Sequence, residues 1–471
     1  MSAACHLDPI PNETICDVLD GCCMDDIVSF ALTSSRFYSL VKTIRSVWLN
    51  ASDKIMLPLP TGHTIRTIPT DLIFSLALRA ISIAKALGED VAVSKRFSHK
   101  DLGDLAGARV PLPGGRWIIY EHRDGFGTHE TNGIQGIDQV LIAEDSGTQV
   151  TAETLGNGIV RCMRSEKYYY HPVLFPETIS ITDVHFPLDA KDRPSLVAAS
   201  SWFIRGPHHV CDLYNSWILD ISGDQREVLC LVDTVRRHGL QMTPDEYNRQ
   251  GRRLYSFSKA KFHPQVAKIV VTVMLYAEEG DEERTEIWLV DLPYFVAHPN
   301  RPEKIAESSM IAWTPVKFSI THRYLVPYEL PMEPPLEVIG GIPESYVYIT
   351  EVRIPPPRMI YGSDLIVALC LSPENEFLPV SLVYLEEGWM PTVPKDWTLA
   401  TKPISRDVIA IAFTTPVGRA LKQIHLKIPG FGTLWKRFEL GKFDPVYGQV
   451  HLTVIGRSLT GFEDPYFVVQ Y

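Results

Sequence analysis

The sequence lacks an excess of basic residues. Its 45 Lys and Arg residues are outnumbered by 56 Asp and Glu residues, which gives a formal net charge of -11 and a pI of about 5.8. Nucleic acids and anionic membranes bind proteins through basic surface that neutralises phosphate. The composition therefore predicts neither a nucleic-acid partner nor a membrane partner.

Long apolar runs and a leader pattern are missing as well. No apolar run reaches the roughly 18 residues that a membrane span needs. The start of the chain, MSAACHLDPIPNE, shows no basic region followed by an apolar one, as a secretory signal would. The 8 cysteines are scattered without paired spacing, which is typical of reduced thiols. We expect a protein of the cytoplasm, the nucleus or both.

Motifs of catalysis are also absent. The chain contains no G-x-x-x-x-G-K-[ST] phosphate loop, no G-x-S-x-G elbow, no H-E-x-x-H and no C-x-x-C pair. His208, His209 and Cys211 form the nearest metal-like cluster, but adjacent strand residues point to opposite faces. We therefore interpret HHVC as an exposed turn, and we predict no catalytic residue, metal site or cofactor.

Three further segments have simple interpretations. The acidic run EEGDEER joins two strong strand patterns and lacks the spacing of a calcium loop, which indicates a hairpin tip. The proline runs at 332–335 and 355–357 are interpreted as rigid loops of a β-domain, although polyproline ligands remain an alternative.

Cys22 and Cys23 raise the question of a redox or metal pair. Adjacent thiols cannot easily close a disulfide, and zinc would need further ligands at suitable spacing. Cys22 continues the helical stripe of Ile15, Val18 and Leu19. Because free cysteine behaves as a small apolar residue, we interpret the pair as core or interface surface.

The chain changes character near residue 90. Before it, apolar residues recur at helical spacing; after it, short apolar or alternating runs are separated by turn residues. The helical stripes lie at 15–22, 27–31, 37–44 and 70–87, with Thr33 or Ser34 as the third N-cap, a closing turn at Trp48 and Gly88 as the last stop. Three short helices bury too little surface to be stable alone, so we expect the unit to lean on a neighbouring domain or a partner.

The remainder of the chain predicts an all-β domain. Its strand candidates lie at 116–121, 195–204, 216–221, 227–233, 268–277, 286–292, 346–352, 364–371, 379–386, 408–413, 422–428 and 449–456. The segments at 185–203, 261–276 and 442–456 share a Phe, a Pro, a turn and an apolar strand, and SWILDI and EIWLVDL follow the first two. This layout favours a β-propeller of about seven blades, with paired sandwiches as the alternative.

The N-terminal helices carry a resemblance to a known family. The stretch IPNETICDVLDGCCMDDIVSFALTSSRFYSLV and the following VWL resemble an F-box. The matching positions are Ile10-Pro11, Glu13, Ile15, Val18-Leu19, Asp26-Ile27, Ala31-Leu32, Arg36-Phe37 and Trp48. The sequence departs from the pattern at Ile10, where Leu is usual, and at Cys22-Cys23, where Leu is frequent. VWLNA, LPLP (57–60) and LPGGRW (112–117) are similar to fungal F-box proteins with a degenerate propeller.

The resemblance implies an α+β multidomain chain. Its parts would be an F-box domain (7–50), a connecting helical segment (51–94) and a β-propeller-like domain (95–471) that recognises a protein substrate. An F-box docks on a Skp-type linker and through it on a cullin, so the chain would be a ubiquitin-ligase adaptor and not an enzyme. The implied linker-binding residues are Pro11, Ile15, Leu19, Ile27, Leu32 and Trp48, some of which must instead form the core of the unit.

Two alternatives stay open at this point. One is a propeller-fold hydrolase or metal-dependent enzyme whose helical start is only a cap. The other is a linker-bound F-box scaffold that acts outside ubiquitylation.

Overall fold

The computed structural model describes residues 10–100 without a gap and, beyond them, mainly strands and adjoining turns. The further described ranges are 109–112, 114, 116–122, 125–130, 139–142, 149–166, 177–189, 192, 194–204, 208–214, 216–222, 226–234, 238–245, 255–263, 267–276, 284–293, 312–326, 336–339, 345–353, 364–371, 377–384, 390–391, 398–405, 408–413, 422–428, 438–454 and 466–471. The proline runs at 332–335 and 355–357 and the acidic residues 281–283 lie outside them.

Helices form the N-terminal part, as predicted. They are α1 (Asn12–Leu19), α2 (Met24–Ala31), α3 (Ser35–Thr43), α4 (Arg45–Leu49), the 3-10 turn η1 (Lys54–Met56) and α5 (Thr70–Ala86). The N-cap of α3 is Ser34, whose hydroxyl accepts a hydrogen bond from the Phe37 amide at 3.2 Å. Helix α1 ends at Leu19, earlier than the predicted stripe, because Asp20 is extended and Gly21 adopts a φ of 73°.

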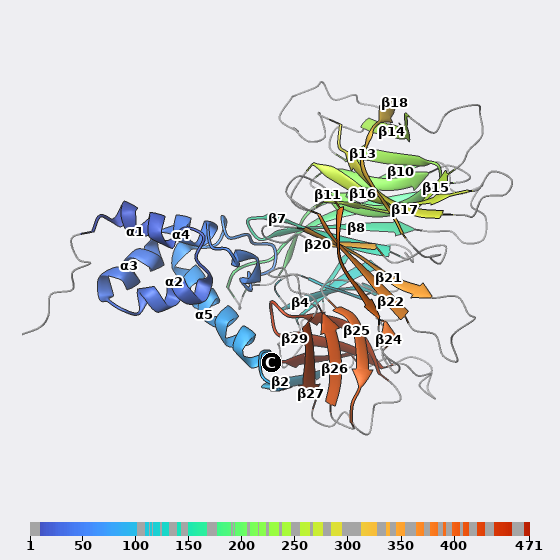
Figure 1. Ribbon diagram of the computed structural model, residues 1–471. Helices are drawn as coiled ribbons and strands as arrows, with labels where there is room; N and C mark the ends of the chain where they lie inside the picture. Colours follow the sequence, from blue (N-terminus) through green and yellow to red (C-terminus); the bar gives the residue numbers. More distant parts are fainter. Residues whose placement is uncertain are drawn as a thin grey trace, which may run out of the picture.

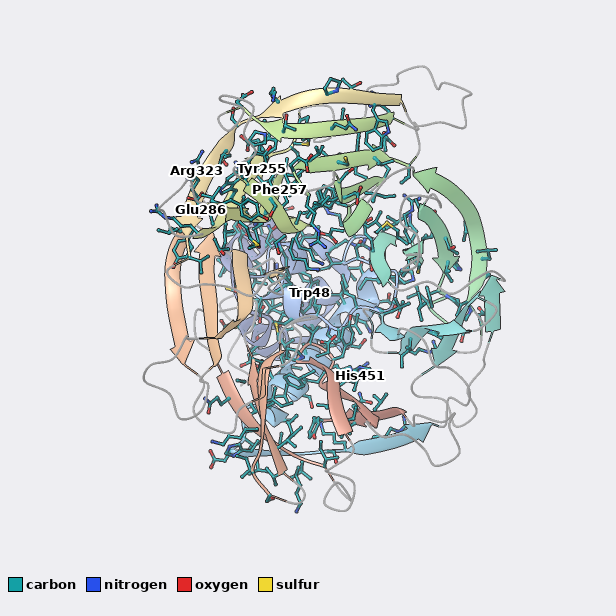
Figure 2. The ribbon with its side chains drawn as sticks, turned by 90° about the vertical axis from the view of Figure 1, so that its right-hand side faces the viewer. Trp48, Tyr255, Phe257, Glu286, Arg323 and His451 are labelled. Atoms are coloured by element: carbon teal, nitrogen blue, oxygen red, sulfur yellow. The ribbon has the colours of Figure 1, made fainter. Side chains whose placement is uncertain are left out.

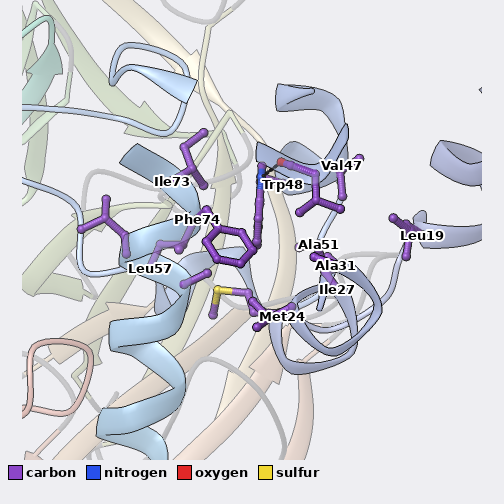
Figure 3. Packing of buried hydrophobic residues seen from close by; sticks show 14 of the residues in the cluster. Leu19, Met24, Ile27, Ala31, Val47, Trp48, Ala51, Leu57, Ile73 and Phe74 are labelled. Atoms are coloured by element: carbon purple, nitrogen blue, oxygen red, sulfur yellow. Dashed lines mark hydrogen bonds between the residues drawn. The ribbon is translucent and has the colours of Figure 1, made fainter. Parts of the chain in front are cut away.

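Trp48 lies at the centre of the helical core (Figure 3). Its ring is fully buried and meets Phe74 of α5 edge-on at 6.2 Å, while its indole N–H donates to the Val41 carbonyl at 2.9 Å. Helix α5 adds Ile73 and Ala77 to the same core. The short helices α1–α4 therefore do lean on a neighbouring element, and that element is α5.

Strands form the rest of the described chain in seven sheets of four or five strands. We number these sheets as blades in chain order. Blade 1 contains β3 (Arg109–Pro111), β4 (Trp117–His122), β5 (Gly125–Glu130) and β6 (Gln139–Ile142). Blade 2 contains β7 (Gln149–Gly156), β8 (Ile159–Glu166), β9 (Glu177–His185) and β10 (Ser195–Ile204). Blade 3 contains β11 (His208–Tyr214), β12 (Trp217–Ser222), β13 (Val228–Asp233), β14 (His238–Pro244) and the later strand β18 (Ala312–Phe318).

The other four blades follow the same plan. Blade 4 contains β15 (Tyr255–Phe262), β16 (Lys268–Leu275), β17 (Arg284–Asp291) and β19 (Ile320–Leu325). Blade 5 contains β20 (Leu336–Ile339), β21 (Ser345–Arg353), β22 (Asp364–Leu371) and β23 (Phe377–Tyr384). Blade 6 contains β24 (Met390–Pro391), β25 (Thr398–Pro403), β26 (Val408–Phe413), β27 (Lys422–Lys427) and the early strand β1 (Val91–Val93). Blade 7 contains β28 (Phe438–Asp444), β29 (Gln449–Val454), β30 (Tyr466–Gln470) and the early strand β2 (Arg96–Lys100).

The sheets stand in a ring around a common axis (Figure 2). The first strands of blades 1 to 5 contact one another in order around the axis, since β3 packs on β7, β7 on β11, β11 on β15 and β15 on β20. Radial sheets with their first strands around one axis make a β-propeller. The prediction of a propeller is confirmed, and paired sandwiches are excluded.

Three strands link parts of the chain that are distant in sequence. Strand β2 pairs antiparallel with β30 and completes blade 7, so the two ends of the β-domain close the ring together. Strands β1 and β18 lie parallel to β27 and β14 as fifth, outermost strands of blades 6 and 3. Because β1 belongs to a blade, the β-domain begins slightly before the predicted boundary at residue 95.

The predicted repeat does not mark equivalent positions in the blades. Phe262 and Phe443 end first strands, whereas Phe186 follows the third strand of blade 2. Turns after first and third strands lie at the same face of a meandering sheet, so the Phe-Pro pattern marks that face and not the blade period. SWILDI falls in the second strand of blade 3 and EIWLVDL in the third strand of blade 4. The interpretation of HHVC as a turn is also wrong, because His208 to Cys211 lie within β11.

Candidate protein-binding surface and its seat on the propeller

The structure divides the six predicted linker-binding residues into two groups. Ile15, Leu19, Ile27 and Trp48 are buried in the core of the helical unit. Pro11 is exposed at the start of α1, and Leu32 is 68% exposed at the end of α2. Only Pro11 and Leu32 are therefore available for contact as the structure stands, and the other four hold the unit together.

Val18 joins the exposed group, although the sequence places it in the apolar stripe of α1. Its side chain is 67% exposed. Pro11 and Val18 are seven residues apart, so they lie on the same side of a helix with 3.6 residues per turn. This seven-residue spacing is the sequence feature that indicates a shared side for Pro11 and Val18. We call Pro11, Val18 and Leu32 the outer apolar set.

Arg36 brings the beginning of α1 to the beginning of α3. Its guanidinium donates to the Ile10 carbonyl and, at 3.0 Å, to the Asn12 side-chain oxygen. Leu32 is the C-cap of α2 and lies four residues before Arg36, so the Arg36 contacts place Pro11 and Leu32 at the same end of the helical unit. Arg36 and the following Phe37 are the Arg-aromatic pair on which the resemblance partly rests, and the arginine here has a structural task.

Cys16, Cys22 and Cys23 beside this surface are free thiols. Burial raises the pKa of Cys16, and burial is also the first cause of the raised pKa of Cys23, whose sulfur lies 3.1 Å from an Asp26 carboxylate oxygen. A raised pKa keeps a thiol protonated and poorly reactive at neutral pH. Among the residues that the structure describes, no three His, Cys, Asp or Glu side chains are grouped to hold a metal ion.

Polar contacts fix α4 to the start of α5. The Arg45 guanidinium donates to the Ile68 carbonyl at 2.6 Å and to the Thr70 hydroxyl at 3.1 Å, and it also contacts the Arg66 carbonyl. Charge-assisted hydrogen bonds of this kind are stronger than neutral ones. They hold the segment between the two helices in one conformation.

That segment rests on the turns of three blades. The Tyr447 hydroxyl of blade 7 donates to the Leu59 carbonyl at 2.7 Å. The Gly158 amide of blade 2 donates to the Gly62 carbonyl at 3.0 Å, and Gly158 in turn accepts from the Phe186 amide at 2.6 Å. Burial is the first cause of the lowered pKa of His63, so its ring is neutral in this contact at pH 7.

Close backbone approach at this contact requires glycine. A Cβ atom on Gly62 would lie 2.4 Å from the carbonyl carbon of Gly158, and a Cβ atom on Gly158 would lie 2.6 Å from the Phe186 carbonyl oxygen. Both glycines have φ near 80°, a backbone conformation that other residues rarely adopt. Blade 1 shows the same feature, since a Cβ atom on Gly114 would overlap Thr61.

The end of α5 completes the contact between the helical unit and the propeller. We call this contact the seat; it also contains Leu59, Gly62, Gly158 and Tyr447. Ile83 and Leu87 share an apolar cluster with Val450 and Tyr471 of blade 7 and with Ala92 of β1. The contacted turns follow first and third strands, so they belong to one face of the ring. Figure 1 shows the helical unit projecting from that face. Figure 2 presents the opposite face of the ring, with the helical unit behind it.

We expect Gly158→Ala to destabilise the protein by about 2 kcal/mol or more, because the new methyl group meets backbone atoms at an unfavourable φ. Gly21→Ala is the matched control, since Gly21 also has a positive φ but nothing lies within 4 Å of the added carbon. Denaturant unfolding of both variants measures the difference. Equal losses of stability would contradict the close backbone contact.

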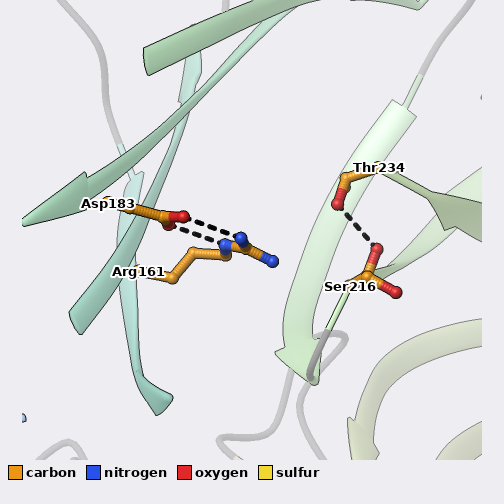
Figure 4. A network of polar contacts seen from close by, with 4 residues as sticks. All are labelled: Arg161, Asp183, Ser216 and Thr234. Carbon is orange, nitrogen blue, oxygen red and sulfur yellow. Dashed lines mark hydrogen bonds and ion pairs between the residues drawn. The ribbon is translucent and has the colours of Figure 1, made fainter. Parts of the chain in front are cut away.

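Polar pairs within the blades are structural. In blade 2, Arg161 and Asp183 form two hydrogen bonds of 2.7 and 2.8 Å between paired strands, and Asp183 raises the pKa of Arg161 (Figure 4). In blade 3 the Thr234 hydroxyl donates to the Ser216 carbonyl at 2.8 Å (Figure 4). Each pair ties neighbouring segments of one blade.

Comparisons with known proteins concern the fold alone. No family model and no curated protein matches the chain in sequence. The WD40 domain of SCAP from fission yeast aligns over 77% of this chain and 84% of its own, with 7% identity and a TM-score of 0.39. An acylaminoacyl peptidase of Pyrococcus horikoshii aligns over 64% of this chain and 42% of its own, with 8% identity and a TM-score of 0.32. The propeller domain of Cps50 (Swd1) from Myceliophteria thermophila aligns over 68% of this chain and 96% of its own, with 11% identity and a TM-score of 0.29.

The assignment of a propeller therefore rests on the sheet topology of this chain itself. Within the described helices, none is both long and apolar enough to cross a membrane.

Proposed function

We propose that the chain is a substrate receptor of the F-box type. Its helical unit would dock on a Skp-type linker and through it on a cullin, and its propeller would hold a protein substrate. The observation that carries the proposal is the outer apolar set: Val18 and Leu32 are about two thirds exposed on a small helical unit that projects from one face of the ring.

The burial pattern supports this role. Removal of exposed aliphatic side chains from water by a partner is favourable, and it lowers the free energy by about 25 cal/mol per Å² of buried apolar surface. A few residues at the centre of an interface usually supply most of the affinity. Ile15, Leu19, Ile27 and Trp48 would then act indirectly, because they fix the positions of the helices that carry Pro11, Val18 and Leu32.

The contact between the helical unit and the propeller supports the proposed adaptor role. The backbone contact between Gly62 and Gly158, the Tyr447 hydrogen bond to Leu59 and the α5 cluster hold the helical unit against one face of the ring. A receptor that joins a ligase to a substrate acts by raising their effective concentration, and this effect is greatest when the geometry is fixed.

The test is binding to a purified Skp-type linker, measured by calorimetry. We expect the unaltered protein to bind and the double variant Val18→Asp, Leu32→Asp to bind at least about tenfold more weakly, a loss of about 1.4 kcal/mol. Leu78→Asp is the matched control, because Leu78 is 44% exposed on α5 outside the outer apolar set.

Two outcomes would overturn the proposal: no binding by the unaltered protein, or equal binding by the double variant. Recruitment of a cullin by the bound complex then separates a ligase receptor from a scaffold that acts outside ubiquitylation.

A further inference from the structure

Strand β10 (Ser195–Ile204) is the outermost strand of blade 2, and no described strand pairs with its outer edge. The outer edge of such a strand presents backbone N–H and C=O groups that another extended chain can pair with. Its sequence, SLVAASSWFI, has ten residues with neither a charged residue nor a proline. Leu196 and Val197 are 46% and 54% exposed.

The other long outer edges of this propeller carry the usual protection against pairing. Strand β18 contains Pro315 and Lys317, β19 contains Arg323, and β23 contains Pro379. Charges and prolines on edge strands prevent pairing with another chain. Strand β10 lacks both devices, and it carries only a bulge at Val197, where the register with β9 shifts.

The propeller also shows that a fifth strand fits at this position. Strands β14 and β27 are the fourth strands of blades 3 and 6, and each accepts an additional strand at its outer edge. Strand β10 is the fourth strand of blade 2, and its regular part beyond the bulge, residues 198–204, is as long as β18.

We propose that two copies of this chain associate by antiparallel pairing of β10 with β10. A two-fold axis at Ser201 places Ser201 opposite itself, Ser200 opposite Trp202, Ala199 opposite Phe203 and Ala198 opposite Ile204. In this register every position except Ser201 pairs a small residue type of one copy with a large residue type of the other, and the sequence brings no like charges together across the pair. The self-complementary size pattern selects a second copy over an unrelated strand.

The position of the strand is compatible with this pairing. Strand β10 lies on the rim of the ring, while the helical unit occupies one face (Figures 1 and 2). Two propellers can therefore meet rim to rim with both helical units free. The inference is independent of the proposed function, because it requires no linker.

Sedimentation equilibrium of the full chain tests the pairing. We expect a reversible dimer with a dissociation constant in the micromolar range. Ser201→Lys and Ser201→Glu should each weaken the dimer at least about tenfold, because like charges then meet at the axis, and an equimolar mixture of the two variants should associate again. Ala198→Lys, at an exposed position, should also weaken it, whereas Ser195→Lys, before the bulge, should not.

Thermal melting confirms that each variant is folded before its association is measured. A monomer in the unaltered protein at concentrations on the order of 0.1 mM would overturn the proposal. A mixture of folded Lys and Glu variants that associates no better than either alone would also overturn it. If both Ser201 variants fail to fold, an Ala198→Lys variant as dimeric as the unaltered chain decides against β10.

Discussion

Deletion of residues 1–100 is expected to abolish cooperative folding of the propeller, whereas deletion of residues 1–94 should leave a folded but less stable ring. The difference between the two is β2, which pairs residue by residue with β30 from Arg96–Gln470 to Lys100–Tyr466. The Lys95 amide adds a hydrogen bond to the Gln470 carbonyl at 2.7 Å. Without β2, blade 7 keeps three strands and exposes the edge of β30.

The physical reason is that β2 joins the two ends of the ring. Pairing residues so far apart in sequence costs loop-closure entropy, and the closed ring recovers it by removing open strand edges. Deletion of 1–94 also removes α5 and β1 and so uncovers Val450 and Tyr471, which explains the expected lower stability of the shorter deletion.

Circular dichroism and thermal melting of the two truncated chains measure the effect. A cooperative transition in both chains at the same temperature would show that β2 is dispensable. A cooperative transition in neither would show that the helical unit and β1, rather than β2, hold the ring closed.

The sequence identifies the helices and the more apolar strands because their patterns are local. Stripes at helical spacing located α1, α2, α3 and α5, and apolar runs located strands such as β10, β22 and β26. Strands β2 (RFSHK) and β19 (ITHRYL) escaped prediction because they are polar and lie at sheet edges, where one face and one edge meet water. No local pattern reports that β18 leaves blade 4 to join blade 3, since that pairing is between distant residues.

The candidate surface shows a similar limit. Val18 and Leu19 are adjacent on α1 and both fit an apolar stripe, yet Leu19 is buried and Val18 is 67% exposed. Two neighbours on a helix point about 100° apart, so which one is covered depends on where the next helix packs. That packing is set by Trp48 and by α5, which lie far along the chain. The sequence therefore identifies the unit but cannot separate its core from its surface.

Trp48→Ala is expected to cost about 3–5 kcal/mol and to unfold α1–α4 locally, because it removes the largest buried side chain of the helical core. The substitution leaves a cavity between α4 and α5, next to Phe74, and removes the hydrogen bond to the Val41 carbonyl. Trp48→Phe is the matched control, because it keeps an aromatic ring and loses mainly that hydrogen bond, at a cost of about 1–2 kcal/mol.

Hydrogen exchange locates the effect of Trp48→Ala in the chain. We expect amides of α1–α4 to lose protection while amides of β13 and β16, in the apolar centre of blades 3 and 4, keep theirs. Equal loss of protection in those strands would mean that the helical unit and the ring unfold as one cooperative body. In that case the loss of stability in the helical unit would reach the ring through the contacts of Gly62, Gly158 and Tyr447, and the two parts would depend on each other for stability.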